Sequence, residues 1–204
     1  MSLHVGRYVF KRADCPDELE QIHALNYATF VQEIPQHADQ REARLVDKFH
    51  AKNKYFVATS CSRVVGMVST HDEPPFSVAN RLPEPEVLHA PGVCPIEVRL
   101  LAIDPLHRRG IVFAGLLWAV YQHVCGGRHT HLFISAYEAR LKLYEHLGFQ
   151  AMGPAVGRLP PRFVPMAIPV SRIAERHAHL VAMWTRRLEK SRENHNVERI
   201  NRAT

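Results

Sequence analysis

The sequence lacks the marks of several large protein classes. Four cysteines occur in 204 residues, and none has the C-x-x-C spacing of zinc or redox sites: Cys15, Cys61, Cys94 and Cys125. No stretch approaches the roughly 18 apolar residues of a membrane-spanning helix, and the first residues show no signal-peptide pattern. The G-x-S-x-G turn of serine hydrolases is also missing. We therefore expect a cytoplasmic protein with reduced thiols and no transmembrane segment.

Histidine, by contrast, is frequent, with fourteen residues. His129 and His131 would share one face of a strand, and His123 lies shortly before them. No cysteine or carboxylate completes a recognisable set of metal ligands at these spacings. We therefore expect no bound metal.

Positive charge is concentrated near the end of the chain. The net charge is +6, and residues 171–204 hold eight cations and four anions, which accounts for +4 of it. No aromatic residues alternate with these cations in the way that single-stranded nucleic acid binding requires. We expect residues 171–204 to form a basic C-terminal helical extension, with nucleic acid an unlikely partner. Residues 1–170 are enough for one globular domain.

The pattern of apolar residues predicts alternating helices and strands, an α/β (α+β) arrangement. Six prolines between residues 74 and 95 predict a long irregular segment of the kind that often covers a site. The expected helices span residues 17–34, 111–124 and 137–147, and the expected strands span residues 54–60, 63–70, 96–104, 131–135 and 163–168.

Residues 143–149, LYEHLGF, form the most informative motif. A helix ends at Gly148, which tolerates a left-handed turn, and Phe149 can fold back onto the last turn. This stretch resembles the C-terminal signature of the GNAT acyltransferases. The resemblance implies that Tyr144 lies beside the thioester sulfur and protonates the departing thiolate. The residues alone are equally consistent with a half-buried helix tyrosine.

Residues 96–117, IEVRLLAIDPLHRRGIVFAGLL, resemble the central strand, pyrophosphate loop and following helix of the same family. The resemblance implies a mixed, mostly antiparallel, splayed sheet flanked by helices, and acyl-CoA or acyl-phosphopantetheine as the donor. If the strand bulges as in relatives, a backbone amide there would stabilise the oxyanion. The implied donor-binding residues are Leu101, Ala102 and Ile103 on the strand and Arg108, Arg109, Gly110 and Ile111 on the loop.

The loop departs from the family pattern [QR]-x-x-G-x-[GA]. In one register Arg108 fills the first position, and Ile111 and Phe113 replace both small residues. In the other, His107 comes first and Val112 replaces the last small residue. Bulky side chains limit the approach of backbone amides to a diphosphate, so we expect weak binding of free coenzyme A.

Residues 26–33, NYATFVQE, followed by Asp47 and a strand at residues 55–58, are similar to the start of the acyl-homoserine-lactone synthases and N-acyl amino acid synthases. An arginine usually stands there in place of Asn26. These GNAT relatives commonly take long acyl chains from acyl carrier protein. The similarity implies that carrier protein is a partner and that Phe30 and Glu33 contact substrate.

Glu97 and Arg99 are two residues apart on one expected strand, so their side chains should project from the same face. Charged groups in an apolar strand are costly unless they meet water, a ligand or each other. The first interpretation makes Glu97 the general base and Arg99 a substrate-binding residue that orients it or an acidic acceptor. The second is a structural ion pair between the two.

Taken together, these features predict an N-acyltransferase that moves an acyl group from a pantetheine thioester to a small-molecule amine, as a monomer or homodimer. The alternative is a binding module of the same fold that has lost catalysis and holds an acyl thioester or a partner protein.

Overall fold

The computed structural model describes residues 2–38, 42–108, 110–157 and 161–173, and five later positions, 175, 178, 182, 183 and 186. Its centre is an eight-stranded sheet in the order β1-β2-β3-β4-β5-β6-β8-β7. Parallel pairing joins β5 and β6, and the other neighbouring strands pair antiparallel. The strands are β1 (Ser2–Val5), β2 (Tyr8–Arg12), β3 (Lys54–Ser60), β4 (Arg63–His71), β5 (Pro95–Ile103), β6 (His131–Tyr137), β7 (Gln150–Ala151) and β8 (Phe163–Pro169). The predicted mixed, mostly antiparallel sheet is confirmed.

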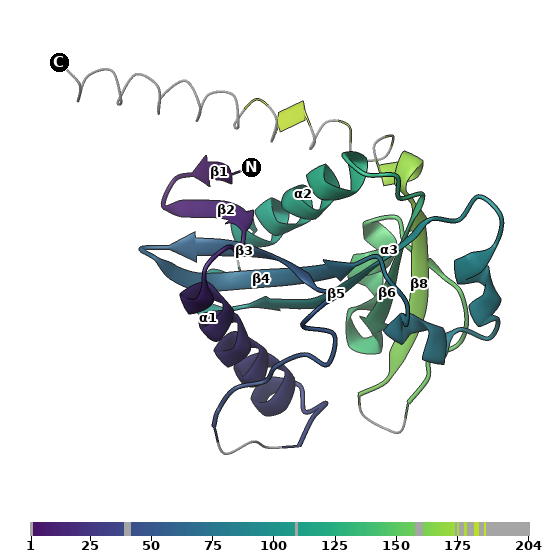
Figure 1. The fold of residues 1–204 in the computed structure, drawn as a ribbon, viewed down its shortest axis with the longest axis horizontal. Coiled ribbons are helices and arrows are strands. Elements are labelled where there is room, and N and C mark those ends of the chain that lie inside the picture. Colours follow the sequence, from purple (N-terminus) through teal and green to yellow (C-terminus); the bar gives the residue numbers. More distant parts are fainter. Residues whose placement is uncertain are drawn as a thin grey trace.

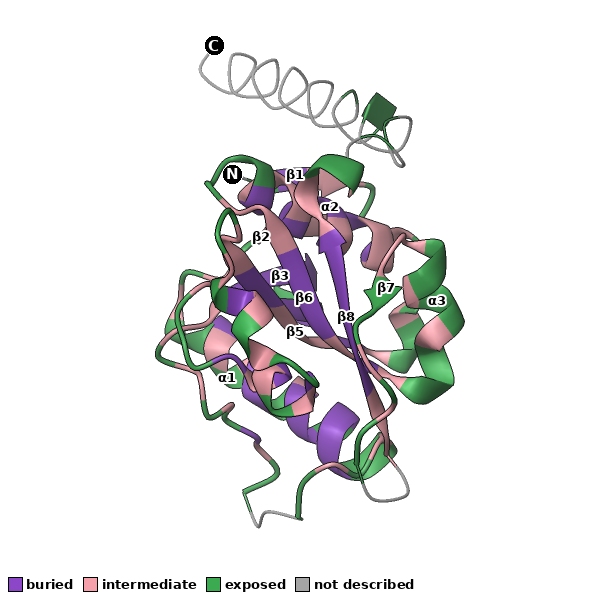
Figure 2. Cartoon of the chain, turned by 90° about the vertical axis from the view of Figure 1, so that its right-hand side faces the viewer, coloured by how far each residue is buried: buried purple, intermediate pink, exposed green. Residues whose placement is uncertain are grey.

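Helices cover both faces of the sheet (Figure 1). On one face lies α1 (Pro16–Tyr27), which continues directly into a π-helical turn, Ala28–Glu33. On the other lie α2 (Ile111–Cys125) and the short α3 (Leu141–His146). Burial is greatest along the strands and the inner sides of α1 and α2, whereas α3 is largely exposed (Figure 2).

The α2 helix packs closely on the sheet because glycine leaves room for its neighbours. A Cβ atom added to Gly115 in α2 would lie 2.2 Å from the Phe10 ring of β2, and one added to Gly66 in β4 would lie 2.8 Å from Val112. Contacts this short force a displacement of the neighbour. The two glycines therefore fix the height of α2 above the strands, and with it the start of the helix beside β5.

The strands β5 and β6 separate partway along their length. They pair from Pro95 to Glu97 on β5, opposite His131 to Phe133 on β6, although both strands continue for several residues beyond this point. The predicted splay of the sheet therefore begins after Glu97. On its other side β5 shifts register against β4, and Leu100 has a φ of +52°. The expected bulge is present and is centred at Leu100, just before residues 101–103.

The proline-rich segment forms two 3-10 turns, Ser77–Arg81 and Pro85–His89. Its apolar side chains, among them Phe76 and Leu88, pack against Phe133 of β6 and Ala167 of β8. The segment therefore covers the outer part of the sheet, on the face that carries α1.

After β8 the chain becomes helical at Val170. Most of the predicted basic extension, residues 171–204, lies outside the described residues. Within the described part of the chain, no helix is long and apolar enough to cross a membrane.

Candidate active site

A cavity of about 260 Å³ opens on the α1 face of the sheet, beside the bulge in β5. It combines charged, polar and apolar side chains from α1, from the loop before β3 and from β5. Its lining residues are Asn26, His37, Leu45, Val46, Asp47, Lys48, Arg99 and Leu100. The cavity therefore brings Arg99, a predicted substrate-binding residue, together with the bulge predicted to stabilise the oxyanion.

Arg99 is held firmly at this cavity. Its Nη2 lies 3.0 Å from Asp47 Oδ1, and its guanidinium carbon lies 4.4 Å from the centre of the Phe49 ring. Its Nη1 is buried and has no hydrogen-bond partner among the described residues. A fixed guanidinium with one free edge is suited to a carboxylate, and the nearby Lys48 adds a second positive charge.

Asp47 is fixed from its other side by Asn53, whose Nδ2 donates to Asp47 Oδ2 at 2.7 Å and to the Tyr55 hydroxyl at 3.1 Å. The Oδ1 of Asn53 in turn lies 3.3 Å from Nδ1 of His71. His71 is completely buried, and burial lowers its pKa to about 4, so it is neutral near pH 7. Asn53 and His71 could not be predicted from the sequence, because no local motif marks them.

Glu97 is fully buried and anchors the proline-rich segment. Its carboxylate accepts hydrogen bonds from the Ser77 amide at 2.7 Å, the Ser77 hydroxyl at 2.5 Å and the Val78 amide at 2.9 Å. His71 Nε2 lies 3.5 Å from Oε2, which is too long for a good hydrogen bond. These contacts describe a loop anchor whose oxygens are both engaged, and the role of general base stays a prediction.

The alternative interpretation of these two charges, an ion pair between Glu97 and Arg99, is wrong. The structure pairs Arg99 with Asp47, and Glu97 with the loop. The strand places both side chains on one face. The partner of Arg99 comes from the loop before β3, and the partners of Glu97 come from the proline-rich segment.

Tyr144 lies on the opposite face of the sheet, in α3. Its ring packs edge-on against Phe149, with ring centres 6.3 Å apart, and belongs to an apolar cluster that includes Val98 of β5. In the described part of the chain its hydroxyl has no hydrogen-bond partner, and burial raises its pKa above the usual value. The group therefore stays protonated at neutral pH, as an acid for a departing thiolate must.

The predicted phosphate ligand Arg108 is already engaged within the protein. Its Nη1 lies 2.6 Å from Glu33 Oε1, its Nη2 contacts Glu33 Oε2, and its Nε donates to the carbonyl of Ile103 at 2.9 Å. Arg108 holds the pKa of Glu33 below its usual range. Arg108 and Glu33 therefore form an ion pair with each other. While they are paired, Arg108 is not free for a donor phosphate and Glu33 is not free for substrate. Arg109 lies outside the described residues.

The start of α2 still offers backbone amides. Gly110 has a φ of +76°, and α2 begins at the next residue, with no side-chain hydrogen bond to its first turn from the described residues. Val112 is fully buried, while Ile111 and Phe113 pack partly against the core. These side chains are thus turned at least partly towards the sheet, which leaves the helix start more open than the sequence predicts.

The remaining predicted residues surround the bulge. Ala102 and Ile103 pair with β4 opposite Met67 and Gly66. Leu101 is half-buried. Phe30, on the π-helical turn, is buried in the core cluster that Leu100 packs against. Phe30 therefore belongs to the core next to the bulge and is not among the residues that line the cavity.

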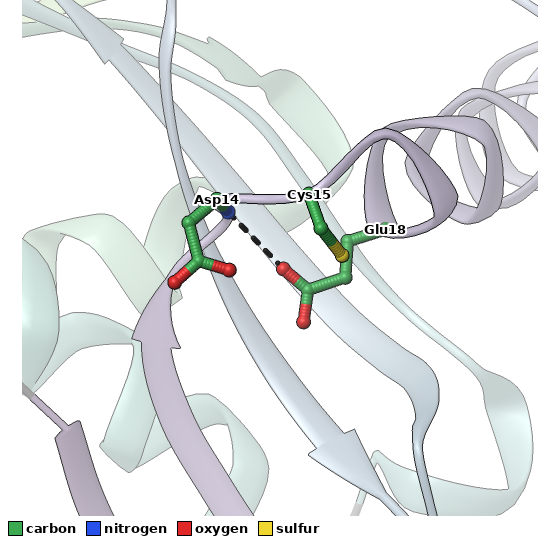
Figure 3. Close-up of side chains that lie close together, drawn as sticks. All are labelled: Asp14, Cys15 and Glu18. Carbon is green, nitrogen blue, oxygen red and sulfur yellow. Dashed lines mark hydrogen bonds between the residues drawn. The ribbon is translucent and has the colours of Figure 1, made fainter.

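Asp14, Cys15 and Glu18 come close together at the start of α1 (Figure 3). The ammonium of Lys11 lies 2.8 Å from Asp14 and 2.9 Å from Glu18, so both carboxylates already have a cation. Asp14 is also largely exposed. We assign this group to the stability of the helix start, where negative charge is favourable, and not to a metal.

Comparison with known proteins identifies the family. The family model for the N-acyl amino acid synthase FeeM matches residues 21–168. The chain belongs to the FeeM family of N-acyl amino acid synthases. A comparison with curated proteins finds no match.

Solved structures show the same fold. FeeM, an N-acyl amino acid synthase from uncultured soil microbes, has a TM-score of 0.66 and 17% identity, over 83% of this chain and 94% of FeeM. The acyl-homoserine-lactone synthase LasI has a TM-score of 0.64 and 17% identity, over 82% of this chain and 91% of LasI. BjaI, a CoA-dependent acyl-homoserine lactone synthase solved with SAM and isopentyl-CoA, has a TM-score of 0.62 and 18% identity, over 80% of this chain and 82% of BjaI.

This FeeM-family chain is therefore an N-acyltransferase, which moves an acyl group from a pantetheine thioester to an amine. The fold and the suspected branch are both confirmed. Nothing in the comparisons supports the alternative of a binding module without catalysis.

Proposed function

We propose that the amine acceptor is a free α-amino acid, bound in the cavity beside β5 with its carboxylate on Arg99. The observation that carries this proposal is the buried guanidinium of Arg99, a residue that lines the cavity and whose Nη1 has no hydrogen-bond partner among the described residues. A carboxylate pairs strongly with such an edge because both groups are charged and planar. Lys48 would strengthen the preference for an anionic acceptor.

The donor thioester would lie in the gap between β5 and β6. Its carbonyl oxygen would meet a backbone amide at the bulge next to Leu100, where β5 departs from regular pairing. The amine would approach from the Arg99 face, and Tyr144 would protonate the thiolate from the other face. Val98 and Arg99 are adjacent on β5 and point to opposite faces, which separates the acid from the acceptor.

The amine must lose a proton as it forms the amide bond. Both oxygens of Asp47 are occupied, by Arg99 and by Asn53. Both oxygens of Glu97, the base predicted from the sequence, are engaged by the loop, so the acceptor would enter with its amine already neutral. The alternative is that Glu97 removes the proton through a water, and Glu97→Gln tests it.

For the donor, we propose a medium or long acyl chain on acyl carrier protein, with the corresponding acyl-CoA used less efficiently. The pairing of Arg108 with Glu33 supports weak binding of free coenzyme A, since it occupies a cation that a diphosphate would need. The open start of α2 would allow the corresponding acyl-CoA to bind as the less efficient donor. We place the enzyme in the cytoplasm, because all four cysteines are free thiols.

An assay of free-thiol release, with mass spectrometry of the product, tests the proposal. The same acyl group is offered on coenzyme A and on carrier protein, with single amino acids as acceptors and with the matching amines that lack the carboxylate. We expect thiol release that depends on an amino acid and yields its N-acyl derivative. Release that is equally fast with the simple amines would exclude the assignment of the cavity to an amino acid.

A further inference from the structure

Asn26 is an unusual buried side chain at the cavity. It lies near the end of α1, two residues before the π-helical turn, and its exposed fraction is 0%. Both Nδ2 and Oδ1 are buried without a hydrogen-bond partner among the described residues. Asn26 nevertheless lines the cavity that holds Arg99.

An unpaired buried amide destabilises a protein. Leaving such a group unsatisfied costs about 1–3 kcal/mol. Leucine has nearly the same shape as asparagine and would fit the apolar surroundings, since Leu45 and Leu100 line the same cavity. A polar group kept at a cost in stability, beside a strained bulge and an adjoining π-helical turn, is typical of a functional position.

We propose that the amide of Asn26 recognises the side chain of the acceptor amino acid, and that this side chain carries a carboxamide. The amide of Asn26 offers two N–H donors and an acceptor oxygen, and a second carboxamide offers the same groups in reversed order, so the two can form a pair of hydrogen bonds. Arg99 would hold the carboxylate of the same molecule. The inference rests on the proposed function, which places an amino acid in this cavity.

The size of the cavity agrees with such a ligand. Its volume of about 260 Å³ lies below the range of about 300–1,000 Å³ that is usual for drug-sized ligands. A free amino acid with a short polar side chain suits this space. Asparagine and glutamine are therefore the acceptors that fit both contacts.

Competition between acceptors of equal shape tests the proposal. Asparagine is compared with leucine, and glutamine with methionine, by kcat/KM for thiol release at a fixed donor concentration. A site built to hydrogen-bond its substrate discriminates strongly against an analogue that leaves its polar groups unpaired. We expect the wild-type enzyme to prefer each carboxamide by about a hundredfold or more.

The variant Asn26→Leu should bring the two members of each pair to within about threefold, while its melting temperature is unchanged or higher because an unpaired polar group has gone. Thr70→Val is the matched control. Thr70 Oγ1 is another buried atom without a partner in the described chain, and Thr70 does not line the cavity. This control should keep the wild-type preference.

Each result decides a separate point. Equal use of asparagine and leucine by the wild-type enzyme overturns the role of Asn26 but leaves the proposed function intact. A preference for the carboxamide acceptors that persists in Asn26→Leu also overturns the role of Asn26. If no amino acid is acylated, the proposed function fails and this inference fails with it. The wild-type ratio alone decides the case if the variant does not fold.

Discussion

The two halves of β5 differ in their roles. The first half stabilises the fold, and the second half contributes to the site. From Pro95 to Glu97 the strand pairs with β6, at Glu97 it also pairs with His71 of β4, and both oxygens of the Glu97 carboxylate accept hydrogen bonds from the loop that it anchors. From Arg99 onward the strand no longer pairs with β6, bulges at Leu100 and carries a guanidinium whose Nη1 has no partner in the described part of the chain.

We expect the chemistry in the half of β5 that no longer pairs with β6. Glu97 and Arg99 lie on the same face and are both charged, but of these two residues only Arg99 has a side-chain polar atom without a partner among the residues that the structure describes. Loss of strand pairing frees backbone and side-chain groups for a ligand, whereas complete pairing and anchoring consumes them. The position at which the strands part therefore separates the stabilising half from the reactive half.

The largest effect is expected from the loss of Tyr144, the proposed acid for the departing thiolate. Tyr144→Phe keeps the ring packing against Phe149 but removes the acid, so kcat should fall about a hundredfold with little change in thermal stability. Because burial raises the pKa of Tyr144, the wild-type kcat should show no alkaline decline from this group below about pH 10. Steady-state kinetics across pH checks both points.

Tyr137→Phe is the matched control for that substitution, because this tyrosine packs against Phe163 at the far end of β6. It should leave kcat nearly unchanged. An unchanged kcat in Tyr144→Phe itself would remove Tyr144 from the mechanism.

The stabilising half predicts a different result at Glu97. Glu97→Gln replaces an acceptor oxygen with an N–H group that faces amide donors, so we expect a loss of about 1–3 kcal/mol in the free energy of unfolding. The turnover of the folded fraction should fall by less than tenfold. Urea unfolding and kinetics on the same sample separate the two. A loss of turnover above a hundredfold at unchanged stability would instead identify Glu97 as the base.

A smaller, pH-dependent effect belongs to His71, next to that anchor. Its folded-state pKa of about 4 is below the ordinary value of 6.5, so between these values the unfolded chain binds the proton more strongly. The contribution of His71 to stability is therefore complete above about pH 6.5 and is lost as the pH falls towards 4. In His71→Gln the free energy of unfolding should therefore fall less between pH 7 and pH 4.5 than in the wild-type protein. Urea unfolding at pH 4.5, 5.5 and 7 measures this difference. An equal fall in both proteins would contradict the assignment to His71.

The smallest effect is expected at the ion pair between Glu33 and Arg108. The pair is more than a third exposed on both sides, so its contribution to stability should stay below about 1 kcal/mol. Glu33→Gln should release Arg108 and raise the affinity for coenzyme A about threefold, whereas Arg108→Gln should not. Calorimetry with coenzyme A measures both. A weaker affinity in Glu33→Gln would mean that the pair shapes the donor site instead of blocking it.

Much of the fold could be predicted from local patterns. The strands near residues 54–60 and 63–70 and the helix from Ile111 follow apolar periodicity and lie close to their expected bounds. The predicted helix 17–34 is divided in the structure, because α1 gives way to a π-helical turn after Tyr27. The helix expected at 137–147 is shorter, since β6 extends to Tyr137 and a 3-10 turn precedes α3. The hairpin of β1 and β2 was missed.

The site was harder to predict because its partners are distant in the chain. Arg99 could be identified as a charged residue in an apolar strand, but Asp47, its partner, lies 52 positions away, and Glu33 lies 75 positions from Arg108. Sequence spacing predicts which side chains share a face. It does not predict which loop will return to meet them.

The role of Arg99 can be tested through the carboxylate of the acceptor. The same amino acid is offered with a free α-carboxylate and as its α-amide, to the wild-type enzyme and to Arg99→Met combined with Asp47→Asn, so that neither charge is left buried alone. Melting temperature confirms that the double variant is folded. We predict that the wild-type kcat/KM favours the carboxylate by about a hundredfold and that the double variant brings the ratio near one. Equal kcat/KM values for both acceptors in the wild-type enzyme would contradict the assignment of Arg99 to the acceptor.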